Sequence, residues 1–323
     1  MIRLGTRAST LALVQSRWVG DRLADALGSQ VELVEITTEG DRVTAPLAQL
    51  GGTGVFVSAL REALLDGRID VAVHSLKDLP TQPADGLVVA AVPLREDPRD
   101  VVVARDGLTL GELPVGSRVG TGSPRRAAQL HALGLGLEIT DIRGNVDSRI
   151  RKVREGAYDA IVLARAGLAR LDRLDEATEM LDPLQMLPAP GQGALAVETR
   201  EGGELEQQVA VLDDAHSRVA VTAERAVLAT LEGGCAAPIG VLAEVAEGDA
   251  GEELWVRAAA LSPDGTLAVR MSATGDPADA AGVGRRLAEQ MLDEGAGQLT
   301  DTPAAQPRTP HEQPVTDCER QDA

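Results

Sequence analysis

The 323-residue sequence has few cysteines, few aromatic residues and no long apolar run. Its two cysteines, Cys235 and Cys318, are too few for a disulfide framework, which favours the reducing cytoplasm. No apolar run approaches the roughly 20 residues that span a bilayer, and the opening MIRLGTR lacks the apolar core of a secretory signal. No cluster of residues suits a metal ion. We therefore expect a cytoplasmic protein with no membrane anchor and no metal centre.

Positive charge is also scarce, but it is concentrated in one stretch. The 31 Lys and Arg residues face 50 Asp and Glu residues, and the net charge of −19 argues against a general binder of nucleic acid or anionic membranes. Between 116 and 170, however, ten cations and five anions give a local charge of +5. A solvated charged face explains Arg151, Lys152 and Arg154 best. It explains less well the arginines at strand ends and helix starts.

Three residue types are so rare that their positions are informative. Lysine occurs only at 77 and 152, Asn145 is the only asparagine, and Phe56 is the only phenylalanine. In a composition this skewed, we expect a rare residue to remain where arginine or leucine would not serve. Lys77, Asn145 and Phe56 all fall in loops that we predict around a cleft.

Alternating strand and helix patterns predict an α/β fold. The composition, 44% hydrophobic and 25% charged, is that of a globular chain, and a prior of ~150 residues per domain gives about two domains. Strands alternate with helices over 1–93 and 94–192, which predicts two lobes with mostly parallel sheets around a cleft. From about His216 the pattern changes to a small α+β unit. The expected strands are 2–6, 31–38, 69–75, 87–93, 100–104, 116–122, 137–144, 158–164, 241–246, 254–262 and 266–275, and the expected helices are 10–27, 55–67, 123–134, one from 145, 165–171, 217–234 and 277–293.

Proline and glycine mark two further segments. LPAPGQGALAVE (187–198) is interpreted as a hinge or a chain crossing between domains. Residues 295–323 contain several prolines and almost no bulky apolar residues, so we expect a disordered tail in which Cys318 is an exposed thiol.

Two strand-to-helix turns have the features of anion sites. In GTGSPRR (120–126), Ser123 is a candidate N-cap and Pro124 a good first helical residue, so free N–H groups and the helix dipole favour an anion. Arg125 and Arg126 add forked donors that suit carboxylates. RGNVDSR (143–149) repeats the design, with Arg143 at a strand end, Asn145 as cap and Arg149 one turn later. Together the two turns indicate a polyanionic ligand.

Two other positions each allow two interpretations. In HSLKDLP, Lys77 and Asp78 form either a surface ion pair or a cleft lysine beside a cleft carboxylate. In LEGGCAAPIG, two glycines and a nearby proline place Cys235 on a tight loop. This thiol is either a small buried hydrophobe or a side chain that points into the cleft.

Six stretches together resemble the motifs of the porphobilinogen deaminase family, whose members are also called hydroxymethylbilane synthases. They are GTRASTLAL, HSLKDLP, VGTGSPRR, RGNVDSR, LPAPGQGA and ERAVLATLEGGCAAPIG, and the likeness runs in order from Ile2 to Leu292. Gly122 and Pro124 stand where the family more often has serine and leucine, and Ser148 stands where threonine is usual. These departures concern local loop geometry alone.

The resemblance implies a transferase that condenses porphobilinogen stepwise, with loss of ammonia, onto a covalently bound dipyrromethane. The linear tetrapyrrole hydroxymethylbilane is then released by hydrolysis. A thioether from Cys235 is implied to carry the cofactor, while Asp78 accepts hydrogen bonds from pyrrole N–H groups and stabilises the cationic intermediate. The residues implied to bind the cofactor are Cys235, Lys77, Asp78, Thr121, Ser123, Arg125, Arg126 and Arg143, and those implied to bind substrate are Arg7, Ser9, Phe56, Arg149 and Arg170.

The resemblance also implies an architecture. Two lobes similar to periplasmic binding proteins, 1–93 completed by 193–213 and 94–192, are expected around the cleft, with a third domain at 216–294 that presents Cys235. A cytoplasmic monomer is implied, without nucleic-acid or membrane partners, whose product passes to uroporphyrinogen-III synthase.

Three other functions are compatible with parts of the pattern. A non-catalytic two-lobed anion-binding protein shares the arginine-rich helix starts but leaves a third domain with a loop cysteine unexplained. A Schiff-base enzyme that uses Lys77 does not explain Asp78 and the many arginines. A thiol hydrolase would pair Cys235 with a histidine. The four histidines, His74, His131, His216 and His311, have no evident link to it.

Overall fold

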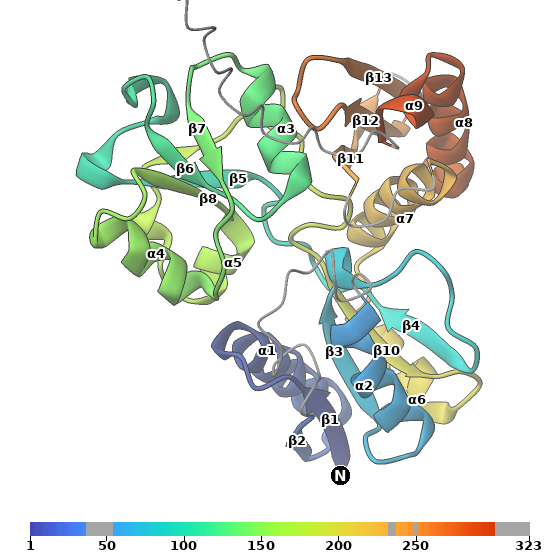
Figure 1. The fold of residues 1–323 in the computed structure, drawn as a ribbon. Helices are drawn as coiled ribbons and strands as arrows, with labels where there is room; N and C mark the ends of the chain where they lie inside the picture. Colours follow the sequence, from blue (N-terminus) through green and yellow to red (C-terminus); the bar gives the residue numbers. More distant parts are fainter. Residues whose placement is uncertain (37–53, 232–236, 249–250, 301–323) are drawn as a thin grey trace, which may run out of the picture.

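Three β-sheets organise the chain in a computed structural model that describes residues 1–36, 54–231, 237–248 and 251–300 (Figure 1). Two five-stranded sheets form the first and second lobes, and a three-stranded sheet forms the third domain. The fold class is therefore as predicted: two α/β lobes and a small α+β unit. Within the described residues, no helix is both long and apolar enough to cross a membrane.

The first lobe is built on a sheet with the strand order β2-β1-β3-β10-β4. Its strands are β1 (Ile2–Thr6), β2 (Val31–Glu35), β3 (Val71–Ser75), β4 (Leu87–Ala91) and β10 (Leu195–Arg200), and its helices are α1 (Thr10–Leu27), α2 (Gly54–Leu65) and α6 (Glu204–Val209). The Ser9 side chain caps α1 by accepting a hydrogen bond from the Ala12 N–H at 3.3 Å, and Gly28, at φ 61°, ends the helix. Val19 and Leu23 of α1 are fully buried against the sheet.

The second lobe is built on a sheet with the strand order β7-β6-β8-β5-β9. Its strands are β5 (Asp100–Ala104), β6 (Arg118–Gly120), β7 (Glu138–Thr140), β8 (Ala160–Ala164) and β9 (Glu179–Met180), and its helices are α3 (Pro124–Ala132), α4 (Val146–Arg154) and α5 (Arg165–Arg170). β6 is shorter than predicted because the backbone leaves the sheet after Gly120 to reach the N-cap of α3 at Ser123.

Both large sheets are mixed rather than mostly parallel. In the first, β1 pairs in parallel with β2 and β3, whereas β10 is antiparallel to β3 and β4. In the second, β6 pairs in parallel with β7 and β8, whereas β5 is antiparallel to β8 and β9. β5 and β10 enter their sheets directly after the chain crosses between lobes, so neither follows the helical crossover that makes neighbouring strands parallel.

The two crossing segments, 92–99 and 181–194, lie against each other between the lobes. The Glu96 N–H donates to the Gly193 carbonyl at 3.3 Å, and Gln192 Nε2 donates to the Pro98 carbonyl at 2.7 Å. A Cβ atom at Gly193 would lie 2.3 Å from the Glu96 carbonyl oxygen, so this close approach requires glycine. The 187–198 stretch is therefore a chain crossing, one of the two predicted alternatives. β10 belongs to the 193–213 segment and lies in the first sheet, where it is yellow among blue strands in Figure 1.

The third domain packs helices on one face of the sheet β11-β12-β13. Its strands are β11 (Ile239–Gly248), β12 (Gly251–Leu261) and β13 (Ala268–Gly275), and its helices are α7 (Ala215–Thr230), α8 (Ala280–Asp293) and α9 (Ala296–Thr300). The prediction of disorder from 295 is wrong for α9, because Ala296 is fully buried in the core of this domain. Cys318 and the rest of the tail from 301 lie outside the described residues, and the predicted domain boundaries stay predictions.

Glu224 of α7 joins the third domain to both crossing segments. Its carboxylate, fully buried, accepts hydrogen bonds from Arg95 Nη1 and Nη2 at 2.7 and 2.9 Å and from the Gly191 N–H at 2.6 Å. It also accepts one from the Ala243 N–H of β11 at 2.9 Å. One carboxylate therefore connects the segments that link the lobes with the helix that precedes residues 231–236.

Candidate functional site

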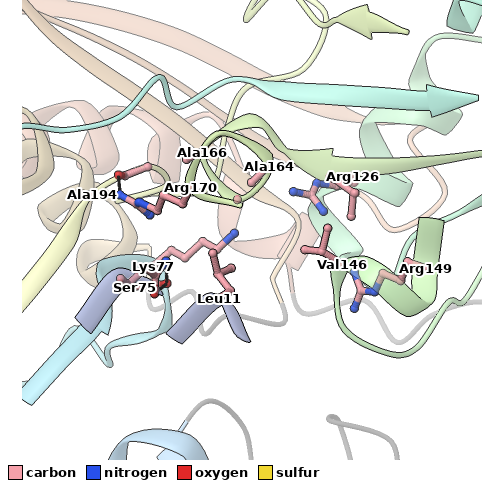
Figure 2. Close-up of a pocket in the computed structure, with 14 residues that line it drawn as sticks. Leu11, Ser75, Lys77, Arg126, Val146, Arg149, Ala164, Ala166, Arg170 and Ala194 are labelled. Carbon is pink, nitrogen blue, oxygen red and sulfur yellow. Dashed lines mark hydrogen bonds between the residues drawn. The ribbon is translucent and has the colours of Figure 1, made fainter. Parts of the chain in front are cut away.

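A cavity of about 140 Å³ lies between the two lobes. The first lobe lines it from α1, β3 and the 3₁₀ helix η3 (Leu76–Asp78), and the second lobe from α3, α4, β8 and α5. Figure 2 shows four cations around it: Lys77, Arg126, Arg149 and Arg170. Among the described residues no carboxylate lines the cavity. In a chain of net charge −19, the described lining of this cavity therefore carries an excess of positive charge.

Lys77 is the cation contributed by the first lobe. It belongs to η3, directly after the buried strand β3, and its Nζ donates to Gln192 Oε1 at 3.3 Å. Burial and, to a lesser degree, Arg126 lower the pKa of Lys77 to about 8, against the opposing effects of Asp78 and Asp100. The cavity therefore holds an ammonium group that loses its proton just above neutral pH.

Arg125 and Arg126, at the start of α3, are both anchored on Asp100 of β5. The exposed fractions are 4% for Arg125, 7% for Arg126 and 0% for Asp100. Each guanidinium donates from Nη2 to an Asp100 carboxylate oxygen at 2.7 Å. Burial alone would raise the pKa of Asp100, but the two arginines outweigh it and hold that pKa below its usual range. Asp100 is therefore a buried anion shared by two cations.

The two neighbouring arginines differ in whether their side chains reach the cavity. Arg126 lines the cavity, although its Nη1 also donates to the Val162 carbonyl at 3.0 Å. Arg125 does not line it, because its other nitrogen, Nη1, donates to the Leu187 carbonyl in the crossing segment. The resemblance assigns both to cofactor binding; the geometry brings only Arg126 to the cavity.

The second predicted anion turn, at the start of α4, has a different arrangement. Asn145 caps the helix by accepting a hydrogen bond from the Ser148 N–H at 2.9 Å. Arg149 lines the cavity, and its Nε donates to the Gly144 carbonyl at 2.8 Å. Burial lowers the pKa of Arg149, and Arg126 lowers it further. Arg143 lies outside the lining, exposed and paired with Asp141 at 3.1 Å.

Arg170, at the end of α5, completes the group of four. Its Nη2 donates to the Gly193 carbonyl of the crossing segment at 2.6 Å, drawn as a dashed line in Figure 2. Burial lowers the pKa of Arg170 to about 10, against the opposing effect of Glu96. The guanidinium therefore stays charged at neutral pH.

The other predicted site residues do not line the cavity. Arg7 is half-buried, Ser9 caps α1, and Ser123 caps α3 by accepting a hydrogen bond from the Arg126 N–H at 3.4 Å. Buried Thr121 accepts a hydrogen bond from the Ser123 N–H at 3.2 Å. Asp78 is half-buried at the end of η3, and its carboxylate makes no hydrogen bond or ion pair with a described residue. The Phe56 side chain and Cys235 lie outside the described residues.

Four polar residues in or beside the cavity, Gln15, Ser75, Gln192 and Asp100, were not predicted from the sequence. Gln15 of α1 lines the cavity with Ser75, to which its Nε2 donates at 3.3 Å. Gln15 follows apolar Leu11 by one helical turn, and a buried polar residue in an apolar stripe is a usable signal. Gln192 stands in the quoted PGQG stretch between two glycines. Asp100 begins an apolar strand, but nothing nearby in the sequence connects it to Arg125 and Arg126.

Comparisons with known proteins cover nearly the whole chain. Residues 2–208 match the family model described as "Porphobilinogen deaminase, dipyromethane cofactor binding domain", and residues 219–293 match "Porphobilinogen deaminase, C-terminal domain". A porphobilinogen deaminase of Mycobacterium tuberculosis is 58% identical over 305 residues, which cover 93% of this chain and 98% of that protein. One from Mycobacterium marinum is 57% identical over 93% of this chain and 96% of its own length.

Solved structures of binding proteins have a lower similarity. The methionine binding protein MetQ matches 65% of this chain and 89% of its own, with a TM-score of 0.43 and 15% identity. A periplasmic substrate-binding protein from Coxiella burnetii matches 66% and 92%, with a TM-score of 0.42 and 16% identity.

Proposed function

The chain belongs to the porphobilinogen deaminase family, and we propose that Lys77, Arg126, Arg149 and Arg170 hold the carboxylates of its dipyrromethane cofactor and its substrate. Its activity is the stepwise condensation of porphobilinogen, followed by hydrolytic release of hydroxymethylbilane. One observation carries the assignment of the site: a cavity between the lobes with four cations and no carboxylate in its described lining.

The lining fits the chemistry of the cofactor. Each pyrrole of the cofactor and of the substrate carries an acetate and a propionate, so every bound pyrrole would bring two carboxylates to this cationic lining. Hydrogen bonds to charged groups contribute about 1.5–3 kcal/mol each, and partial burial strengthens them. When bound, the cofactor supplies the pyrrole carbon to which substrate units are joined. Arg149 and Arg170, which bond only to backbone carbonyls among described residues, are the groups we assign to the incoming substrate.

We assign attachment of the cofactor to Cys235. Helix α7, which precedes this cysteine, contacts the segment just after Asp78: Arg225 donates from Nη1 to the Leu79 carbonyl at 3.1 Å and from Nη2 to the Pro80 carbonyl at 2.6 Å. Helix α7 therefore lies close to the segment that directly follows η3. This proximity supports a thiol and a carboxylate that serve one cleft.

The test of this assignment is an intact-protein mass spectrum. We expect wild-type protein and Cys318→Ser to carry an excess mass equal to a dipyrromethane, and Cys235→Ser to lack it and to have no turnover. A non-catalytic anion-binding protein would show no adduct and would not consume porphobilinogen. Full activity in Cys235→Ser would overturn the assignment.

We propose that Asp78 accepts hydrogen bonds from pyrrole N–H groups and stabilises the positive charge that develops during condensation. Its lack of a described ion-pair partner supports a carboxylate available to a ligand. Asp78→Asn keeps the shape and removes the charge, so turnover should fall by at least ~10²–10³. Asp78→Glu, which keeps a displaced charge, should retain a small measurable fraction. The structure shows no ion pair between the described residues Asp78 and Lys77, one of the two interpretations of this pair in the sequence. A half-buried carboxylate with no role in condensation would alter stability by ~0–1 kcal/mol and leave the rate unchanged. Steady-state assays and thermal melts of both variants distinguish these outcomes.

We also propose that the protein is a cytoplasmic monomer and that its product passes to uroporphyrinogen-III synthase. The family supports these assignments. Sedimentation of the full chain tests whether the protein is a monomer. Assays with and without that synthase test whether the product passes to it.

A further inference from the structure

Gln192 lies in the crossing segment between the lobes and is 1% exposed. Its amide nitrogen donates twice, to the Pro98 carbonyl at 2.7 Å and to Asp100 Oδ1 at 2.8 Å. Its amide oxygen accepts from Lys77 Nζ at 3.3 Å. A carbonyl and a carboxylate can only accept, and an ammonium can only donate. The partners therefore fix the orientation of the amide, and rotating it would break all three bonds.

The flanking glycines make this position possible. Gly191 and Gly193 have φ values of +74° and +86°, and a Cβ at Gly191 would lie 3.3 Å from the Lys77 backbone nitrogen. A Cβ at Gly193 would meet the Glu96 carbonyl oxygen at 2.3 Å. The backbone of 191–193 therefore passes close to η3 on one side and to the other crossing segment on the other. A side chain placed there reaches both lobes.

We propose that Gln192 is a positioning residue, which holds Lys77 of the first lobe and Asp100 of the second in one hydrogen-bonded chain beside the cavity. Because Asp100 also holds Arg126, the chain runs from Arg126 through Asp100 and Gln192 to Lys77. It fixes the spacing of two cavity cations from different lobes. Its consequence for cofactor loading rests on the proposed function.

Glutamine has the functional groups that this place requires. Glutamate would turn a carboxylate oxygen toward Asp100 and would lose the donor to Pro98. Methionine has a similar shape but neither donates nor accepts strongly, so it would leave the Lys77 ammonium without this acceptor. Among the described residues, the charged groups that act on Lys77 are Arg125 and Arg126, which disfavour its charged form, and Asp78 and Asp100, which favour it. Loss of the amide oxygen leaves that balance less favourable to the ammonium.

The chain has only two lysines, so the Lys77 ammonium can be observed directly. We would label the protein with ¹³C-lysine in a Cys235→Ser background and follow the two Cε resonances against pH, with Lys152→Arg to identify them. Gln192→Met should lower the Lys77 midpoint by about one pH unit. Gln192→Glu, which adds a negative charge, should raise it. The opposite signs keep the proposal testable if either variant fails to fold.

Gln129 provides a matched control. It is fully buried and holds Leu187 of the same crossing segment, with its Nε2 donating at 3.0 Å and its Oε1 accepting at 2.8 Å. Gln129→Met should destabilise the fold as Gln192→Met does and leave the Lys77 midpoint unchanged. An unchanged midpoint in both Gln192 variants, or an equal fall in Gln129→Met, would overturn the proposal.

A second measurement separates this inference from the proposed function. With Cys235 intact, the mass spectrum of Gln192→Met should show a several-fold smaller fraction carrying dipyrromethane than that of Gln129→Met. If wild-type protein carries no adduct, the proposed function fails, while the lysine titration still tests the hydrogen-bonded chain through Gln192. If wild-type protein carries the adduct and Gln192→Met matches Gln129→Met in both measurements, the positioning role of Gln192 is overturned and the proposed function remains.

Discussion

The N-termini of α3 and α4 have the same design in the sequence and different surroundings in the structure. Both begin with a side-chain cap and carry arginines at the start of the helix. At α3, the Arg125 and Arg126 side chains are 4% and 8% exposed and share Asp100. At α4, the Arg143 side chain is 43% exposed and forms an ion pair with Asp141. Arg149 lines the cavity, and among the described residues its hydrogen-bond partner is the backbone carbonyl of Gly144.

The difference separates two uses of arginine. A guanidinium neutralised by a buried carboxylate holds the fold together and has little charge left for a ligand. One that bonds only to a carbonyl keeps its full charge for a carboxylate that arrives later. Arg126 combines the two, since it is paired with Asp100 and still lines the cavity.

The largest effect is expected where a buried carboxylate is removed. Asp100→Asn would leave two buried guanidinium groups without their anion and should cost about 3–5 kcal/mol of unfolding free energy. Asp141→Asn makes the same chemical change in an exposed pair and should cost only ~0–1 kcal/mol. Denaturant unfolding of both variants measures the comparison. Equal losses would mean that the two helix starts are alike after all.

The next effect is on turnover and separates the two arginines at α4. Arg149→Leu removes a cavity cation and should lower kcat/KM by roughly 10- to 100-fold, with little change in stability. Arg143→Leu removes an exposed one and should have a much smaller effect. A loss from Arg143→Leu as large as that from Arg149→Leu would show that the resemblance locates the ligand better than the cavity does.

The smallest effect is a dependence on pH from the first lobe. Burial lowers the pKa of Lys77 to about 8, so the ammonium is present below that pH and lost above it. Porphobilinogen binding by Cys235→Ser protein should therefore weaken several-fold between pH 7 and 9, as measured by calorimetry. Lys77→Arg stays charged and should bind equally at both pH values. If the affinity of Cys235→Ser protein with Lys77 intact does not change between these pH values, Lys77 is excluded as a carboxylate partner.

The lowered pKa of Lys77 affects stability in the opposite direction from ligand affinity as the pH rises. Between the folded pKa of about 8 and the ordinary value of 10.5, the unfolded chain binds more protons at Lys77 than the folded chain. This contribution to the free energy of unfolding therefore rises with pH through that window. Ligand affinity and the stability of the empty protein should move in opposite directions.

Local signals predicted much of the fold. The predicted caps at Ser123 and Asn145 are confirmed, because capping depends on residues within one turn of the chain. The antiparallel placement of β5 and β10 was not predicted, since it depends on where the chain crosses between lobes. Helix α9 was missed because the small residue Ala296 is buried by tertiary contacts, which composition does not record.

The site was predicted in type and only partly in membership. Excess arginine between 116 and 170 indicated an anion site, and four of the predicted cations do line one cavity. Sequence could not show that Arg125 is turned away, because its partner Asp100 lies 25 residues distant and on another element. Nor could it show Gln192, whose role depends on both lobes being in place.

The position of β10 within the first sheet has a consequence for how the chain folds during synthesis. β3 and β4 are joined only through β10, and residues 92–194 separate β4 from it. The sheet of the first lobe therefore stays incomplete, with the edge of β3 unpaired, until the ribosome has produced the whole second lobe. The described strands of the second lobe, β5 to β9, all lie within that interval. Closing so long a loop is slow, and the waiting edge is a surface for mispairing. We expect the lobe that is encoded second to be the one that folds first.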